Sequence, residues 1–534
     1  MPIAFDANLG GLAGVICLAL LVSRIRKSAS SLPLPPGPPS IPFLGNVIGL
    51  KPDTVWLSYT EWAVKYGEIM YTTTLNQRVL VISSERVATD LMDKRSNIYS
   101  DRLQMALVDV FGLGVLTSSI PYGPLWRKHR RLYHQVFQER SALRYRPQQL
   151  QKAYNMVEQF MEDPEHYLEH LQSYAAAVVM SIVYGYDIYP INDPIINAAK
   201  ISIDMVTKVA TPEKSAIIAV FPSLLKLPAW FPGMSFLNDS IICRKYADEM
   251  FDLPYEYVKK SLAEGVAKPS MVSDAIQRYK LDSDETSDPE MTQVIKCSSA
   301  TAFAESFHLV KACALKSLSL FLAASDTTNA TILVFFIAMM QNPEIQARAH
   351  AELDRVVGDK RLPVFEDRAA LPYIDALIRE VRRWRPITPI GVPHATVEDD
   401  VYEGYYIPKG VAVVSNLWAI SRNEAKYPSP ETFRPERFIG PDGELTDDTV
   451  QWSFGFGRRI CPGRHIADAA LWGAIASFLA VFRIEKPDGP EEEIKWKHGL
   501  TICPLPFKCK FVPRRDDINP TKLKSLIELS MGSW

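Results

Sequence analysis

The stretch Phe454-Gly455-Phe456-Gly457-Arg458-Arg459-Ile460-Cys461-Pro462-Gly463 places a single cysteine on a glycine-punctuated loop, directly before a long alanine-rich helical segment. Glycines and a proline around one thiol favour a tight turn in which the backbone approaches a flat group closely. Backbone N–H groups and the positive end of the following helix favour the ionised thiol. We therefore interpret Cys461 as a metal ligand, with a buried core cysteine as the alternative.

The residues around Cys461 restrict the kind of metal. A second thiol at zinc-finger spacing is missing, and His465 is the one nearby imidazole, so a four-ligand structural zinc site does not fit. A single axial thiolate is what a haem iron needs. The seven cysteines of the chain are scattered and odd in number, which indicates a reducing compartment without a disulfide framework.

The spacing F-x-x-G-x-R-x-C-x-G, formed by Phe454, Gly457, Arg459, Cys461 and Gly463, resembles the haem-binding loop of the cytochrome P-450 monooxygenases. This resemblance implies haem b on Cys461. It also implies a mainly α-helical fold with a small β region, in which haem lies between a long central helix and the cysteine loop. The thiolate pushes electron density onto the iron and favours cleavage of the O–O bond.

The amino-acid composition adds little to the prediction of function. Hydrophobic residues make up 47% of the 534 residues, which is ample for a large core. A net charge of −2 gives no reason to expect nucleic acid as a partner.

The chain has no dinucleotide-binding glycine pattern or flavin motif. The resemblance therefore implies electrons from NADPH through a separate NADPH-cytochrome reductase, and we expect it to dock on basic residues, namely Arg458, Arg464, Lys128 and Arg131.

The N-terminal segment 3–22 is apolar and about as long as the ~20 residues that span a bilayer. Basic residues at 24, 26 and 27 follow it, which predicts a single-pass anchor with the catalytic body in the cytosol. A cleaved secretory signal is the alternative. With the resemblance, we expect an anchor over 1–27 in the endoplasmic reticulum membrane, a proline-rich hinge over 28–46, a catalytic domain over 47–512 and a polar tail over 513–534.

Two further segments are expected at the haem propionates. Trp126 and Arg130 share one face of a predicted helix over 126–137. Taken alone, this is an ordinary solvated basic helix. The resemblance implies that its indole N–H and guanidinium donate to a propionate, for which arginine is well suited. His394 is a further propionate candidate, with a plain core or loop histidine as the alternative.

The predicted central helix contains Ala323-Ala324-Ser325-Asp326-Thr327-Thr328 and ends at Asn342-Pro343. Ser325 or Asp326 could simply be a helix N-cap. The resemblance implies that Asp326 and Thr327 lie over the haem and relay protons to bound oxygen, since an acid and a hydroxyl suit that task. Ala324 stands where the family usually has glycine, which affects how wide the oxygen groove opens.

The segment 304–321 makes the chain longer than related fungal enzymes between Ile295-Lys296 and the Asp326-Thr327 pair. Removing these 18 residues restores the eight-residue spacing of those relatives. We therefore suspect an insertion, such as a retained intron of fifty-four nucleotides. Eighteen residues make about five whole helical turns, so an insertion built as helix would leave Asp326 on the same face.

Helical patterns are predicted over 55–66, 85–94, 344–357 and 371–384, and strand patterns over 69–83 and 401–418. The helix over 371–384 carries Glu380 and Arg383, an E-x-x-R pair that is common in any helix. The resemblance pairs both with Arg437 in a buried charge network beneath the haem, which fixes the cysteine loop. It also places 387–392 and 499–504 along the substrate pocket.

These motifs together predict a haem-thiolate monooxygenase that inserts one atom of O2 into a hydrophobic small molecule, in fungal secondary metabolism or xenobiotic oxidation. A haem-thiolate isomerase or dehydratase is one alternative, although it needs no proton relay such as Asp326 and Thr327. A haem-binding protein without turnover is the other, if the insertion or Ala324 impairs the distal helix.

Overall fold

The computed structural model describes most of the chain, namely residues 32–42, 44–74, 77–189, 193–210, 214–215, 217–218, 221–281, 288–304, 325–490 and 492–532. The predicted anchor at 3–22 lies outside the described residues, as do Ala324 and all but the first residue of the suspected insertion.

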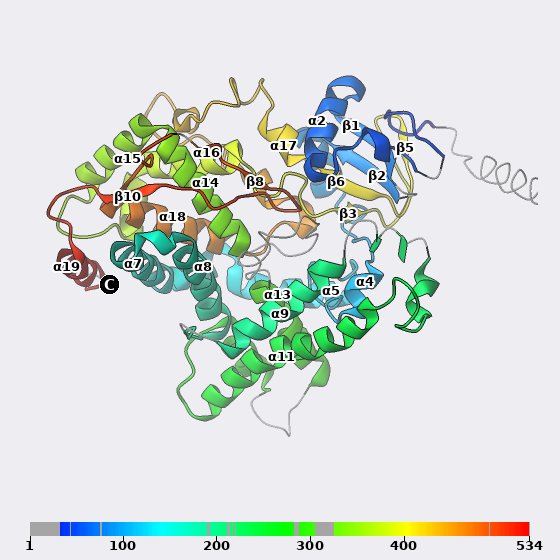
Figure 1. The fold of residues 1–534 in the computed structure, drawn as a ribbon, viewed down its shortest axis with the longest axis horizontal. Coiled ribbons are helices and arrows are strands. Elements are labelled where there is room, and N and C mark those ends of the chain that lie inside the picture. The colour runs from blue at the N-terminus through cyan, green and yellow to red at the C-terminus, as the bar shows by residue number, and fades with distance from the viewer. Residues whose placement is uncertain are drawn as a thin grey trace, which may run out of the picture.

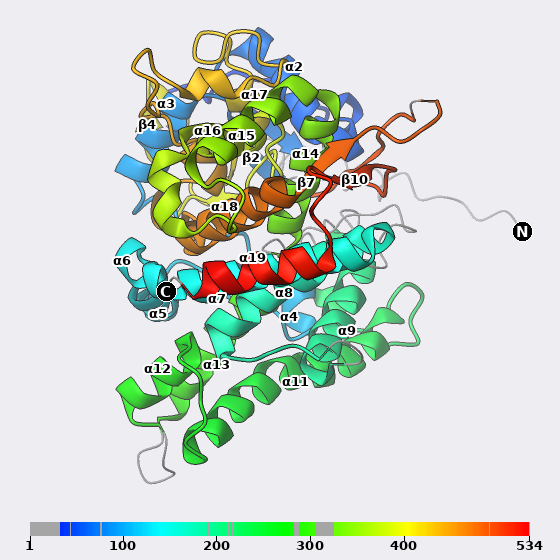
Figure 2. The same ribbon diagram turned by 90° about the vertical axis from the view of Figure 1, so that its left-hand side faces the viewer.

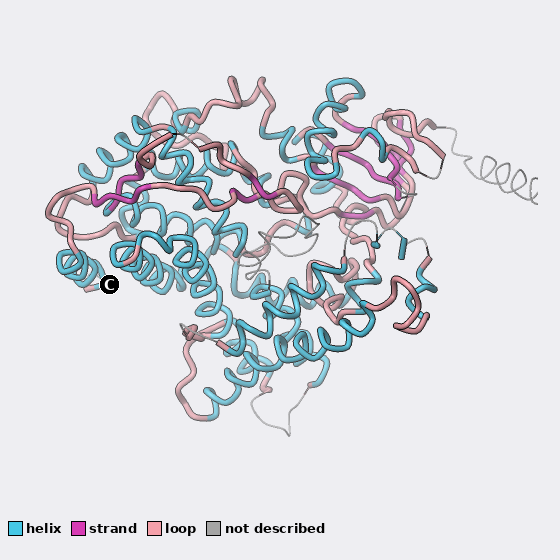
Figure 3. Tube along the Cα trace, viewed as in Figure 1, coloured by secondary structure: helices cyan, strands magenta, loops and turns pink. Residues whose placement is uncertain are grey.

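Helices dominate the described part of the chain, and strands are short (Figure 3). The α-helices are α2 (Val55–Tyr66), α3 (Glu85–Ala88), α4 (Ala106–Val110), α5 (Pro124–Phe137), α6 (Glu139–Ala142), α7 (Arg146–Glu162), α8 (Tyr167–Tyr184), α9 (Pro194–Val209), α11 (Phe236–Ala263), α12 (Met271–Tyr279), α13 (Pro289–Ala304), α14 (Ser325–Gln341), α15 (Pro343–Val356), α16 (Pro372–Trp384), α17 (Leu417–Ser421), α18 (Arg464–Val481) and α19 (Pro520–Met531). The strands are β1 (Ile69–Thr74), β2 (Gln77–Ile82), β3 (His394–Ala395), β4 (Asp400–Tyr402), β5 (Tyr405–Ile407), β6 (Ala412–Ser415), β7 (Phe482–Glu485), β8 (Trp496–Lys497), β9 (Cys503–Pro504) and β10 (Lys510–Pro513).

The largest sheet has the strand order β1-β2-β6-β3 and lies beside α2 (Figure 1). β1 and β2 are antiparallel with Ile69 opposite Ile82, whereas β2 and β6 are parallel with Val79 opposite Ala412. Leu80 and its neighbours at 81 and 82 are fully buried, because both faces of β2 are covered. The two predicted strand regions are thus confirmed, the first as the hairpin β1-β2 and the second as β4, β5 and β6.

The helical core forms where α7, α14, α18 and β10 meet. Phe336 of α14 lies 4.9 Å from Phe478 of α18, 5.9 Å from Phe160 of α7 and 5.0 Å from Phe511 of β10, as measured between ring centroids. Apolar burial of this kind is the main stabilising contribution to folding. Because α18 begins directly after the cysteine loop, this core anchors the loop at its C-terminal end.

The helix predictions over 55–66, 126–137, 344–357 and 371–384 are confirmed by α2, α5, α15 and α16. Three of these helices start with a proline in the first turn, at Pro124, Pro343 and Pro372. Proline suits that position because its missing N–H would have no partner there. The prediction over 85–94 holds in part, since α3 continues at Thr89–Lys94 as a π-helical turn.

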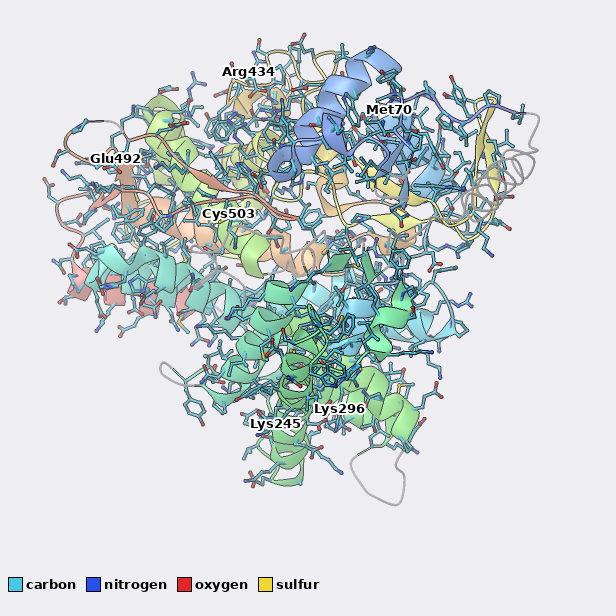
Figure 4. All side chains as sticks on the ribbon, turned by 45° about the vertical axis from the view of Figure 1, so that its right-hand side comes forward. Met70, Lys245, Lys296, Arg434, Glu492 and Cys503 are labelled. Carbon is cyan, nitrogen blue, oxygen red and sulfur yellow. The ribbon has the colours of Figure 1, made fainter. Side chains whose placement is uncertain are left out.

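A second helical layer consists of α9, α11, α12 and α13 (Figure 2). Figure 4 labels Lys245 of α11 and Lys296 of α13 in this layer, whereas Arg434 lies at the opposite side of the molecule. The Lys296 ammonium is 2.9 Å from the Asp252 carboxylate and so joins α13 to α11.

Both described ends of the chain are tied to the body. In the hinge, the carbonyls of Pro33 and Pro36 accept hydrogen bonds from the backbone N–H groups of β5 and β1. At the other end, α19 lies along α7 (Figure 2). Its buried side chains Leu523 and Leu526 explain why the predicted polar tail folds as a helix.

Candidate haem site

The cysteine loop is a chain of tight turns that leads into α18. The Cys461 N–H donates to the Phe454 carbonyl at 2.9 Å, which closes the loop, and Arg464 donates to the Cys461 carbonyl at 3.4 Å. Cys461 is half-buried. The cysteines in the described residues form no disulfide with one another, and these residues contain no cluster of three or more His, Cys, Asp or Glu side chains that would hold a metal.

Gly457 is the glycine that the loop cannot replace. Its φ of +60° is left-handed, and a Cβ there would lie 1.8 Å from the Met92 carbonyl oxygen. The Gly457 N–H also donates to the Asp93 carboxylate, whose pKa burial raises. At Gly463 a Cβ would meet no atom of the described chain within 4 Å, so packing alone does not require that glycine.

Trp126 and Arg130 lie against this loop, as the sequence predicts for α5. Arg130 donates to the Ile460 carbonyl at 2.8 Å, directly before the cysteine. The guanidinium of Arg459 lies 4.7 Å from the ring centroid of Trp126 and that of Arg130 lies 5.7 Å from it. Within the described residues the Trp126 indole N–H makes no hydrogen bond. Two cations and one donor therefore gather beside Cys461.

The half-buried side chain of Arg459 donates only to backbone carbonyls, those of Ser100, Thr117 and Ile120. Burial lowers its pKa to about 8, and the positive charge of Arg102 adds to this effect. Burial likewise lowers the pKa of Arg130. In the described part of the chain neither guanidinium forms an ion pair with an acid. Removing a cation even partly from water is costly without an opposite charge, so these residues fit the carboxylates of haem b.

His394 lies in the same region and is almost fully buried. Its Nδ1 is 2.7 Å from the Tyr99 carbonyl, so Nδ1 must carry the hydrogen, because a carbonyl only accepts. Burial lowers the pKa of His394 well below its ordinary value, and the neighbouring Arg102 and Arg459 add to this effect. The neutral ring has only an acceptor at Nε2, so it would donate to a propionate there only as the imidazolium.

The predicted charge network beneath the loop is confirmed. Glu380 and Arg383 are fully buried and joined by two hydrogen bonds of 2.8 and 2.6 Å. Arg437 lies 3.1 Å from the same carboxylate, and the Arg434 N–H donates to it at 2.8 Å. Charge-assisted bonds of this kind hold the segment before the cysteine loop against α16.

The distal half of the predicted site is described only in part. Thr327 is a half-buried residue of α14, and its carbonyl accepts from Thr331 at 2.6 Å. The side chain of Asp326 lies outside the described residues, so the structure does not bring the predicted relay pair together. β9 packs on α14, and the Ile502 N–H donates to the Ile387 carbonyl at 2.7 Å. The two segments expected to line the pocket therefore adjoin each other, and the second of them adjoins this helix through β9.

Sequence reasoning missed several residues that support the site. The Asp93 carboxylate accepts from the Gly457 N–H, and the Thr117 carbonyl accepts from Arg459. Arg102 donates to the Pro393 carbonyl, directly before His394. No spacing signal in the sequence indicates them, because their partners lie hundreds of residues away. Their proximity follows only from the fold.

The pattern of the cytochrome P-450 family matches residues 35–511. Cytochrome P-450 monooxygenase 98 of Postia placenta is 36% identical over 512 residues, which cover 93% of each chain. Cytochrome P-450 monooxygenase COX2 of Coprinopsis cinerea is 34% identical over 94% of this chain and 92% of its own. Tryptamine 4-monooxygenase of Psilocybe cyanescens is 34% identical over 95% of this chain and 97% of its own.

A mainly helical fold with a small sheet, a cysteine loop and adjacent half-buried arginines is typical of a haem-thiolate protein. The chain belongs to the cytochrome P-450 family, with fungal monooxygenases among its relatives. It is accordingly an oxidoreductase of the monooxygenase class whose cofactor is haem b. Such an enzyme uses O2, a small-molecule substrate and a redox partner.

The predicted location in the endoplasmic reticulum membrane is contradicted by the helices that the structure describes. None of these helices is both long and apolar enough to cross a bilayer. Residues 3–22, on which the predicted anchor relied, lie outside the described part of the chain. We therefore withdraw that location.

Proposed function

We propose that this enzyme inserts one atom of O2 into a hydrophobic small molecule, using electrons that NADPH supplies through a flavoprotein reductase. The observation that carries the proposal is the pair of half-buried cations, Arg130 and Arg459, which lie beside Cys461 and bind backbone carbonyls of its loop and its surroundings. Haem bound there would supply oxygen activation, with Cys461 as the residue that would hold its iron.

The residues of the site take the following proposed roles. Cys461 is the iron ligand, and Phe454, Gly457 and Gly463 shape its loop. Trp126, Arg130 and Arg459 hold the propionates, for which their donors and charges are suited. His394, the further propionate candidate, would donate to one only as the imidazolium, which burial disfavours. Asp326 and Thr327 hold and pass the protons that oxygen reduction requires.

The proposed substrate is largely apolar. The segments 387–392 and 499–504 contain no acidic or basic residue, and they meet through the hydrogen bond between Ile502 and Ile387. Apolar walls with few polar groups are typical of small-molecule sites. A cationic amine would find no carboxylate on these segments. Tryptamine, which the Psilocybe cyanescens relative is named for, is therefore an informative negative probe.

The proposed reductase surface is the basic face of α5 and the cysteine loop. Arg127, Arg131 and Arg458 are exposed there, which suits electrostatic steering of a transient partner. Lys128, which we also expected to contribute, forms an ion pair with Glu290. Its charge is therefore partly compensated, and the arginines carry more of the attraction.

In the proposed domain layout, residues 28–46 form the hinge, 47–512 the catalytic domain and 513–534 the tail. The segment 304–321 is an insertion between α13 and α14. These two helices contain 16 and 17 residues and both pack on α8. This arrangement supports the idea that they are two parts of one long helix.

Two measurements on the haem-loaded enzyme test the proposed function. The reduced carbon monoxide complex should show a thiolate-type Soret band, and NADPH consumption with a flavoprotein reductase should rise with a neutral apolar substrate. A thiolate-type band without substrate-stimulated consumption would favour a binding protein. Substrate turnover without O2 uptake would favour an isomerase or dehydratase. A compound library screened for Soret shifts, with tryptamine included, would identify the substrate class.

A further inference from the structure

Thr117, in the loop before α5, binds three separate parts of the fold. Its N–H donates to the Thr301 hydroxyl of α13 at 2.9 Å. Its own hydroxyl lies 2.8 Å from His129 Nδ1 and 3.1 Å from the Tyr133 hydroxyl, both on α5. Its carbonyl accepts from Arg459 at 3.1 Å. All of these side chains except Arg459 are at most 7% exposed, so water does not replace these bonds.

The hydrogens in this network have only one consistent arrangement. Tyr133 donates its single hydroxyl hydrogen to the Ser298 carbonyl at 2.7 Å, so at the shared contact Thr117 is the donor. Thr117 has then used its own hydrogen, so His129 must donate from Nδ1. The Thr301 hydroxyl donates to a carbonyl one turn earlier on α13 and accepts from Thr117.

This arrangement makes the Thr117 hydroxyl both an acceptor and a donor within a buried chain. Without it, the His129 N–H and the Tyr133 oxygen would each lose a partner inside the protein. Buried polar networks are favourable only when every member is satisfied. Burial also lowers the pKa of His129 to about 4, so the ring stays neutral and the arrangement holds near neutral pH.

We propose that Thr117 is a positioning residue that holds the haem-binding Arg459 in register with α5 and α13. The carbonyl that binds Arg459 belongs to the same residue whose hydroxyl and N–H bind the two helices. A shift of Thr117 therefore moves an acceptor of the Arg459 guanidinium. This inference depends on haem binding alone and not on the reaction with oxygen, so it stands or falls separately from the proposed function.

The test compares the rate of haem loss to excess apomyoglobin for three variants of the full chain. Thr117→Val removes the hydroxyl at nearly constant volume and should lose haem about tenfold faster, as expected for one net buried hydrogen bond. Thr117→Ser keeps the hydroxyl and should stay within about twofold of the wild type. The matched control is Thr72→Val, which removes a buried hydroxyl from β1, bound at 2.8 Å to Asn46.

Thermal unfolding of the haem-loaded variants, followed by far-ultraviolet circular dichroism, separates positioning from general destabilisation. We expect Thr117→Val and Thr72→Val to lower the midpoint alike, while only the former speeds haem loss. Equal rates of haem loss in these two variants, or a Thr117→Ser rate as fast as that of Thr117→Val, would overturn the proposal. If Thr117→Val does not fold, Thr301→Val removes the acceptor of the Thr117 N–H. Haem loss several-fold faster than in the wild type then supports the proposal, and an unchanged rate refutes it.

Discussion

Replacing Glu380 by glutamine should strongly destabilise the enzyme, although the side chains have the same shape. The Glu380 carboxylate is fully buried and accepts two hydrogen bonds from Arg383 at 2.6 and 2.8 Å. It also accepts from the Arg434 N–H at 2.8 Å and lies 3.1 Å from the Arg437 guanidinium. Every neighbour that it contacts in this way is a donor.

The size of the effect follows from this geometry. Glutamine places an NH2 donor against arginine donors and removes the negative charge between Arg383 and Arg437. One or two charge-assisted hydrogen bonds, each contributing roughly 1.5–3 kcal/mol, are lost. Breaking a buried ion pair by removing one partner costs about 3–5 kcal/mol. A chain of 534 residues has an unfolding entropy of roughly 1 kcal/mol/K, so the midpoint should fall by about 3–5 °C.

Thermal unfolding at a fixed scan rate, followed by near-ultraviolet circular dichroism, measures this shift. Glu61→Gln is the matched control, because Glu61 pairs with Lys51 at the surface, where the side chains are 62% and 61% exposed. An exposed pair contributes about 0–1 kcal/mol, so the control should shift by at most about 1 °C. If Glu380→Gln unfolds at the same temperature as this control, the buried network does not stabilise the cysteine loop as we infer.

Three further predictions concern the cofactor, the pH and the transcript. Arg459→Gln should lose haem at least tenfold faster than the wild type, and Arg459→Lys should be intermediate, because lysine keeps the charge without the planar fork; apomyoglobin transfer measures both rates. Burial lowers the pKa values of His129 and His350 from 6.5 to about 4, so the unfolded chain binds more protons between these values. The free energy of unfolding should therefore fall as the pH drops from 6.5 to 4, by up to about 1.4 kcal/mol per pH unit for each histidine, and urea titrations of His350→Gln should show the smaller slope. If 304–321 is an insertion, transcript sequencing should show the fifty-four nucleotides spliced out, whereas a full-length protein with normal haem uptake would contradict it.

The sequence predicted the helices well because their signals are local. A proline in the first turn and apolar residues at helical spacing mark α5, α15 and α16 within a few positions. The π-helical turn at Thr89–Lys94 and the C-terminal helix α19 were not anticipated. Both depend on tertiary contacts, Met92 and Asp93 with Gly457 in the first case and Leu523 with the core in the second.

The site residues likewise divide into those with a local sequence signal and those that only the fold brings together. Cys461, Gly457 and Arg459 lie within one loop, so their spacing alone was enough to find them. The sequence could not tell which groups Arg459 contacts, because its three acceptor carbonyls lie more than 300 residues earlier. The motif thus points to the arginine that we propose for the haem propionates, and we propose that Thr117 and its partners on α5 and α13 determine how firmly that arginine is held. Variation at Thr117 should therefore change haem affinity among proteins that share an identical cysteine loop.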